Sequence, residues 1–329
     1  MDIIDFHVHL PWNPHSVREA SSILLRELDN ASVKLAVVIN VEFGIETFKS
    51  NVSSKSIIEA GLEVFDYIFD YKFRFIERFI GDPERTIREH VEFMEKNNRD
   101  SELFVEGLSG LDRLIPVVSY NPDIGVEANY DRLRRLSNKI LGLKIFPTLH
   151  FTRPDSTGLS KLYSLIGSIG GVVIIHTGCD PGIWELPAFC RTSRPSIVAK
   201  IAKAYRDVVF IVAHLGSYSA LKPGIYFDEA IEALSIDNVY ADTSAVEPYF
   251  IEKAVEEVGY DKILFGSDYP VVLGLTLEDA ISGIMSLGIP GNAKRAILYD
   301  NAVKILRNWN GWSRVERIIS NHSSGNGCS

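Results

Sequence analysis

The stretch Val172-Val173-Ile174-Ile175-His176-Thr177-Gly178 begins with four β-branched apolar residues, and a histidine follows them directly. The same pattern returns at residues 208–216, where Val-Val-Phe-Ile-Val-Ala precedes His214. A continuous apolar run of this length, without alternation of polar and apolar residues, is typical of a strand buried on both faces. Each stretch therefore predicts a strand of a parallel sheet with a polar side chain near its carboxyl end.

Eight such apolar runs recur along the chain, and most are separated by amphipathic segments with helical spacing. This alternation predicts an α/β fold, and eight repeats favour a closed (β/α)8 TIM barrel over the alternative, an open doubly wound sheet. No Gly-x-Gly-x-x-Gly motif follows any run, so a dinucleotide site has no support. The predicted strands are Ile3–Phe6, Leu35–Val41, Leu114–Val118, Leu141–Phe146, Val172–Ile175, Val208–Ala213, Val239–Ala241 and Ile263–Phe265.

The 329 residues exceed the roughly 250 of a typical barrel. We predict one barrel over residues 1–310, with the surplus in a helical insertion at about residues 45–112 between strands 2 and 3, and a helix end and flexible tail at 311–329. The insertion could act as a lid, complete the substrate pocket or form a homodimer contact. It contains a predicted helix at Arg85–Asn97 and a hydrophobic stripe at helical spacing formed by Phe65, Ile68, Phe69, Phe73, Ile76 and Phe79.

Composition excludes several classes of protein. The formal net charge of -9 argues against binding to nucleic acid or an anionic membrane, which both favour a basic surface. No apolar run approaches the length of a membrane span, and the N-terminus does not resemble a signal peptide. The three cysteines, Cys179, Cys190 and Cys328, have no Cys-x-x-Cys spacing, so we predict reduced thiols in a cytoplasmic protein.

Polar residues that can bind a metal follow four of the predicted strands. His7 and His9 are two residues apart after strand 1, so their side chains project to the same side. His176, His214 and Asp268 follow strands 5, 6 and 8. In a barrel these strand ends meet at one mouth, and imidazole and carboxylate groups are typical zinc ligands. The pattern predicts a site for Zn or for another divalent metal such as Mn.

Local motifs at these strand ends resemble the amidohydrolase superfamily. The resemblance is closest to the branch called amidohydrolase family 2, which includes the aminocarboxymuconate semialdehyde decarboxylase-like metal-dependent hydrolases. It spans roughly residues 2–308 without most of the insertion, and it is specific for the superfamily but not for a substrate. The motifs are Asp5-Phe6-His7-Val8-His9, Gly142-Leu143-Lys144-Ile145-Phe146-Pro147, His176-Thr177-Gly178, Ala213-His214-Leu215-Gly216, Asp242-Thr243-Ser244 and Phe265-Gly266-Ser267-Asp268-Tyr269-Pro270.

The resemblance implies roles for these residues. His7, His9, His176 and Asp268 would bind one metal ion per chain, which lowers the pKa of a bound water toward about 7, and Asp268 would take the proton of that water. His214 would polarise the substrate carbonyl or bind a second metal. Lys144 would be either a carboxylated lysine that bridges two metals, as in some superfamily members, or a plain lysine that binds substrate.

Two enzymatic functions share this set of residues. The first is a metal-dependent hydrolase of an amide, ester or lactone, and the alternative is a non-oxidative decarboxylase (lyase) of an aromatic or unsaturated carboxylic acid. Hydrolysis without a metal and a catalytically silent metal-binding protein are further alternatives. Arginine suits a small-molecule substrate that bears a carboxylate. The candidate substrate-binding residues in loops after strands 1, 4, 5 and 6 are Trp12, Phe151, Arg153, Trp184, Arg191, Arg194, Tyr218 and Lys222.

Overall fold

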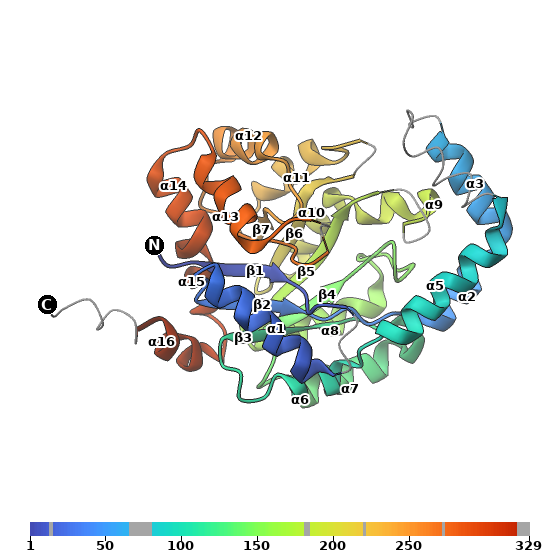
Figure 1. Cartoon of the computed structure of the whole chain (residues 1–329), viewed down its shortest axis with the longest axis horizontal. Coiled ribbons are helices and arrows are strands. Elements are labelled where there is room, and N and C mark those ends of the chain that lie inside the picture. The colour runs from blue at the N-terminus through green and yellow to red at the C-terminus, as the bar shows by residue number, and fades with distance from the viewer. Residues whose placement is uncertain (13–15, 66–80, 181–184, 220–221, 272–273, 321–329) are drawn as a thin grey trace, which may run out of the picture.

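The eight apolar runs form one sheet of eight parallel strands in the computed structural model, paired in sequence order from first to last (Figure 1). The structure describes the whole chain apart from residues 13–15, 66–80, 181–184, 220–221, 272–273 and 321–329. The strands are β1 (Ile4–Val8), β2 (Leu35–Ile39), β3 (Leu114–Ser119), β4 (Gly142–Ile145), β5 (Val172–Gly178), β6 (Val209–Tyr218), β7 (Val239–Asp242) and β8 (Ile263–Leu264).

The segment after β8 closes the sheet into a barrel. The backbone N–H of Phe6 in β1 donates to the carbonyl of Phe265 at 2.8 Å. Further along, the N–H of Asp268 donates to the carbonyl of His7 at 2.9 Å, and that of His9 to the carbonyl of Tyr269 at 2.7 Å. The edge of β1 is therefore paired with the end of the β8 segment. The predicted TIM barrel is confirmed and the open sheet is excluded.

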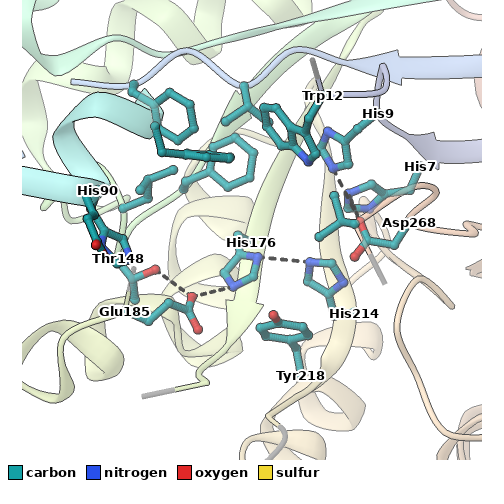
Figure 2. A pocket seen from close by; sticks show the side chains of 17 residues that line it. His7, His9, Trp12, His90, Thr148, His176, Glu185, His214, Tyr218 and Asp268 are labelled. Atoms are coloured by element: carbon teal, nitrogen blue, oxygen red, sulfur yellow. Dashed lines mark hydrogen bonds and ion pairs between the residues drawn. The ribbon is translucent and has the colours of Figure 1, made fainter. Parts of the chain in front are cut away.

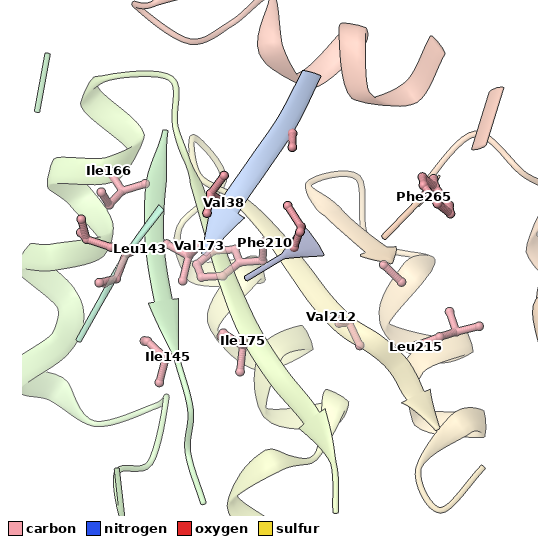
Figure 3. Packing of buried hydrophobic residues seen from close by; sticks show 14 of the residues in the cluster. Val38, Leu143, Ile145, Ile166, Val173, Ile175, Phe210, Val212, Leu215 and Phe265 are labelled. Atoms are coloured by element: carbon pink, nitrogen blue, oxygen red, sulfur yellow. The ribbon is translucent and has the colours of Figure 1, made fainter. Parts of the chain in front are cut away.

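Two apolar layers hold the barrel together. Side chains of successive strand residues alternate in direction, so Val173 and Ile175 of β5 pack outward with Ile166 in the layer under the helices (Figure 3). Val172 and Ile174 belong to the second layer, which fills the barrel interior. His176 is two residues after Ile174, so its side chain also points toward the barrel axis. A strand that is apolar on both faces therefore presents a polar group at its carboxyl end.

Helices surround the sheet, and three of them extend beyond the carboxyl ends of the strands (Figure 1). These three, α2 (Ile45–Asn51), α3 (Ser54–Phe65) and α5 (Pro83–Asn97), belong to the insertion between β2 and β3. The other α-helices among the described residues are α1 (Val17–Asn30), α6 (Ser101–Gly107), α7 (Gly125–Leu136), α8 (Ser160–Ser168), α9 (Pro187–Cys190), α10 (Pro195–Ala204), α11 (Phe227–Leu234), α12 (Pro248–Val258), α13 (Leu277–Ser286), α14 (Gly291–Arg295), α15 (Asn301–Leu306) and α16 (Trp312–Ser320).

The predicted helix at Arg85–Asn97 is confirmed as α5, which begins two residues earlier. Asp82 caps it by accepting a hydrogen bond from the backbone N–H of Arg85, and Pro83 is suited to the first helical position because it lacks an N–H group. The hydrophobic stripe from Phe65 to Phe79 lies outside the residues whose side chains are described. Within the described part of the chain, no helix is long and apolar enough to cross a membrane.

The prediction of reduced thiols is wrong for two of the cysteines. Cys179 and Cys190 form a disulfide with a Cα–Cα distance of 5.4 Å. Cys179 directly follows β5 and Cys190 is the last residue of α9, 11 positions further along the chain. Spacing rules detect close pairs and not this arrangement. The cysteines therefore no longer support a cytoplasmic location.

Candidate active site

Three side chains converge at the carboxyl ends of β1 and β8. Nε2 of His7 lies 3.5 Å from Oδ1 of Asp268, and Nε2 of His9 lies 3.4 Å from the same oxygen (Figure 2). All three side chains are buried. We call His7, His9 and Asp268 the floor of the site.

The other nitrogen of each floor histidine is held by a hydrogen-bond acceptor. Nδ1 of His7 lies 2.8 Å from Oδ2 of Asp242, and Nδ1 of His9 lies 2.9 Å from the carbonyl oxygen of Ile39. Because a carbonyl or carboxylate oxygen accepts the hydrogen bond, each Nδ1 carries the proton and each Nε2 presents a lone pair. Such partners fix the tautomer and the ring orientation of metal-binding histidines.

The floor fits a divalent metal. The two Nε2 atoms and one carboxylate oxygen all lie within 4.8 Å of one another. In a tetrahedral zinc site with ligands about 2.0–2.2 Å from the ion, ligand atoms lie roughly 3.3–3.6 Å apart, close to the distances between Asp268 and the histidines. Metal binding requires neutral imidazole and ionised carboxylate, and the surroundings of the floor favour both forms.

Burial and neighbouring charges favour these protonation states. Burial lowers the pKa of His7 well below its usual value, and the nearby Lys144 ammonium lowers it further. For Asp268, burial opposes ionisation, but the surrounding imidazoles, among them His9, outweigh it, so the pKa of Asp268 lies below its usual value.

Unusual backbone conformations place the site residues. His214 and Asp268 have φ values of 62° and 58°, in the left-handed region that non-glycine residues rarely adopt. Such conformations cluster at functional sites. Gly266 is required for a different reason: a Cβ atom there would lie 2.7 Å from Cβ of His7, so only glycine lets the end of β8 approach β1 this closely.

His176 and His214 form a second pair beside the floor. Nδ1 of His214 donates to the carbonyl of Ser244 at 2.9 Å, and its Nε2 lies 3.0 Å from Nδ1 of His176. Nε2 of His176 lies 2.7 Å from Oε1 of Glu185 (Figure 2). The structure thus brings His176 against His214 and Glu185, and not into the group of ligand atoms formed by the floor.

Lys144 lies beside the floor. It is fully buried, with Nζ 3.4 Å from Nε2 of His7 and 4.9 Å from the ring centre of Phe146. Burial lowers the pKa of Lys144 to about 8, against the opposing effect of Asp242 and Asp268. Nζ lies beside a predicted metal ligand, where a carboxylated lysine would stand, but Lys144 is fully buried and does not line the cavity, as a lysine that binds substrate would.

A cavity of about 500 Å³ opens above these residues. Trp12 and Tyr218, two of the predicted substrate-binding residues, line it, and its described lining contains no arginine or lysine. The full lining is His7, His9, Trp12, Val41, Phe43, Glu89, His90, Phe93, Phe146, Thr148, Leu149, His176, Glu185, His214, Tyr218, Asp268 and Val271.

The structure does not bring the three predicted arginines to this cavity. Nε of Arg153 lies 3.0 Å from Oδ1 of Asp155. Nε of Arg194 donates to Oε1 of Glu229 at 2.7 Å. Arg191 is exposed and also lies outside the lining. Trp184 is among the residues that the structure does not describe.

Sequence reasoning missed two acids at the site. Asp242 follows strand 7 as the predicted ligands follow theirs, so the strand-end signal was present but no role was assigned to it. In addition to its contact with His7, the Asp242 carboxylate accepts a hydrogen bond from the backbone N–H of His214 at 2.9 Å. Glu185 gave no signal, because it lies away from the predicted strand ends, in the segment between β5 and α9.

A parallel barrel with histidines and an aspartate at its strand ends belongs to a recognisable class of TIM-barrel enzymes. A sequence model of the amidohydrolase family matches residues 4–307, and this chain belongs to that family. The resemblance drawn from the motifs is confirmed, and the protein is an enzyme of the amidohydrolase type. No curated protein sequence matches the chain.

Solved structures share the fold at low sequence identity. The 5-carboxyvanillate decarboxylase of Sphingomonas paucimobilis has a TM-score of 0.57 at 13% identity, covering 93% of this chain and 99% of that one. A probable 2-pyrone-4,6-dicarboxylic acid hydrolase of Acinetobacter baumannii has a TM-score of 0.58 with the same identity and coverage. The 2,6-dihydroxybenzoate decarboxylase of Rhizobium has a TM-score of 0.57 at 13% identity, covering 93% and 98%.

Proposed function

We propose that this protein is a metal-dependent hydrolase that cleaves an amide, ester or lactone in a small carboxylate-bearing molecule. The observation that supports this most directly is the convergence of the His7 and His9 Nε2 atoms with a carboxylate oxygen of Asp268 at the base of a cavity. Zinc is the proposed ion, with manganese as the other candidate and one ion per chain. When bound, the ion would supply Lewis-acid activation of water and of the reacting carbonyl.

Asp268, His214 and His176 have separate roles in proton transfer, orientation of the reacting group and metal binding. Asp268 takes a proton from the attacking water and returns it to the leaving group, because its free carboxylate faces the cavity beside both histidines. His214, fixed by Ser244 and His176, orients the reacting group. His176 joins the metal site, as the family resemblance implies, if its contact with Glu185 is exchanged for the ion.

Non-oxidative decarboxylation on the same floor is the second candidate. The aromatic lining of the cavity favours it, because an apolar environment disfavours a carboxylate relative to the neutral carbon dioxide that leaves. In that reaction a proton replaces the carboxyl group on the substrate carbon, and Asp268 or water supplies it. Structurally similar proteins are named for both reactions.

One screen tests both candidates. Zinc- or manganese-loaded protein is offered lactones, amides and aromatic carboxylic acids, while acid production and carbon dioxide release are followed in parallel. The hydrolase predicts acid without carbon dioxide, and the decarboxylase predicts the reverse. Metal analysis after gentle purification is the control, since less than about half an equivalent per chain contradicts a catalytic metal.

A further inference from the structure

The carboxylate of Glu42, shortly after β2, is buried and accepts four hydrogen bonds. Its Oε1 accepts from Nδ2 of Asn121 at 2.7 Å and from Nη1 of Arg132 at 2.8 Å. Its Oε2 accepts from the backbone N–H of Ser101 at 3.1 Å and from the hydroxyl of the same residue. These partners are buried as well. Asn121 follows β3, Arg132 lies in α7 and Ser101 begins α6, so one side chain joins three separate segments to the end of β2.

Further hydrogen bonds tie the two ends of the insertion together. Nδ2 of Asn40 donates to the carbonyl of Arg99 at 2.7 Å, and the N–H of Phe43 donates to Oδ1 of Asn98 at 2.9 Å. Residues 40–43 lead from β2 into the insertion, and residues 98–101 lead from α5 toward β3. The two ends are therefore fixed to each other, and the Glu42 carboxylate fixes both to the barrel.

Glu42 lies between two residues that line the cavity. Val41 and Phe43 belong to the described lining, and Glu42 does not. Its backbone carbonyl accepts a hydrogen bond from Nε2 of His150 at 3.0 Å, in the loop that contributes Leu149 to the same lining. Because the side chain of Glu42 is held behind the cavity, it can fix the lining without meeting a ligand.

Phe43 connects this position to the inserted helix α5. Its ring centre lies 6.3 Å from that of Trp12 and 6.3 Å from that of Phe93 in α5. Phe43 also packs in a buried cluster with Met94 of the same helix. Since closely packed side chains leave little free space, a shift of Phe43 moves the side of the cavity that α5 forms.

We propose that Glu42 is a positioning residue for substrate binding. Its buried carboxylate fixes Phe43, and through Phe43 the helix α5, at the distance from the floor that the substrate needs. The insertion is then a fixed side of the pocket and not a lid that opens at its base. This role rests on the proposed function only in taking the cavity above the floor as the substrate site.

Two zinc-binding probes of different size test this role by isothermal titration calorimetry on the full-length, zinc-loaded chain. Acetohydroxamate occupies the floor alone, whereas 2-naphthohydroxamate carries rings that extend along the cavity to Phe43. In Glu42→Gln an amide of the same size directs its own N–H groups at N–H donors. Affinity for 2-naphthohydroxamate should therefore fall by about 3- to 10-fold, the range of one aromatic contact, with that for acetohydroxamate unchanged. Glu46→Gln, the same change at an exposed position of α2, is the matched control and should alter neither affinity.

A double-mutant cycle separates positioning from a purely structural role. Phe43→Ala alone should weaken 2-naphthohydroxamate binding. Adding Glu42→Gln should cause no further loss, because both changes remove the same contact. Asn121→Ala, which removes one of the four donors, should act in the same direction with a smaller loss. It replaces Glu42→Gln if thermal melting shows that variant to be unfolded.

A lower melting temperature in Glu42→Gln with an unchanged ratio of the two affinities would overturn the proposal, as would additive losses in the double variant. Wild-type affinity for 2-naphthohydroxamate no higher than that for acetohydroxamate would also overturn it, because Phe43 would then not contribute to the ligand site. Failure of the proposed function is distinct: the wild-type chain would hold no zinc and bind neither probe, and the role of Glu42 in substrate binding would fail with it.

Discussion

The floor and the aromatic wall, which the rings of Trp12, Phe43 and Phe93 form, line the same cavity but are built in different ways. The floor residues stand at strand ends, and each imidazole is oriented by the hydrogen bond that it donates to a buried backbone carbonyl or a buried acid. The wall consists of rings from loops and one inserted helix, which apolar packing holds together. This difference predicts that the reaction and the choice of substrate can be changed separately, because the floor and the wall belong to different parts of the fold.

The largest effect is expected at the floor, from Asp268→Asn. The amide cannot take a proton from water, so kcat should fall by about 10²–10⁴-fold, the usual contribution of a general base. Zinc binding should weaken less than in His7→Ala, because the amide oxygen can still approach the ion. Turnover close to that of the wild type would refute the assignment of Asp268 as the base.

Acid should lower the free energy of unfolding through a buried histidine, His150. His150, in the loop after β4, is fully buried, and its Nε2 donates to the carbonyl of Glu42, near the start of the insertion. Burial lowers the pKa of His150 to about 4. The unfolded chain binds this proton near pH 6.5 and the folded chain only near pH 4, so this contribution to stability is complete above pH 6.5 and is lost as pH falls toward 4.

Chemical denaturation at pH 7 and pH 4 measures this loss. The difference in pKa corresponds to about 3 kcal/mol of unfolding free energy. Other buried histidines also titrate, so the informative quantity is the difference between the wild type and His150→Gln, whose stability should fall by about 3 kcal/mol less over the same interval. Parallel pH profiles for the two proteins would contradict the assignment.

Asp242→Asn tests whether the contact of Asp242 with His7 supports metal binding at the floor. Asp242 accepts from Nδ1 of His7, and loss of such a partner typically costs about 10- to 100-fold in metal affinity. Competition with a zinc chelator measures the change. Asp237→Asn, at an exposed position before the same strand, is the control. Equal zinc affinities in the two variants would show that the His7–Asp242 contact has only a structural role.

The smallest effect is expected at the wall, from Trp12→Leu. Loss of one aromatic surface should raise KM by about 3- to 10-fold with kcat nearly unchanged, because the ring holds the substrate and does not touch the reacting bond. Tyr249→Leu removes an aromatic ring that is 62% exposed outside the cavity and serves as the control. A fall in kcat as large as the rise in KM would show that the wall affects the reaction as well as substrate binding.

Much of the barrel and the floor could be predicted from local sequence. Buried parallel strands need continuous apolar runs, so Val172–Ile175 reveals β5 without knowledge of its neighbours. His7 and His9 share a strand face because successive side chains alternate. The positions of the arginines could not be predicted in this way, because a loop residue can point in many directions. Arg153 and Arg194 lie near acids outside the cavity.

The sequence alone determined the eight-stranded barrel, the inserted helix α5 and the family, because these depend on periodicity and on motifs of a few residues. Only the tertiary structure decided what surrounds them: the contact of Glu185 with His176, the Cys179–Cys190 disulfide, and the rings that face the floor. These pairings join residues from separate loops, and their partners depend on how the chain packs and not on any local pattern.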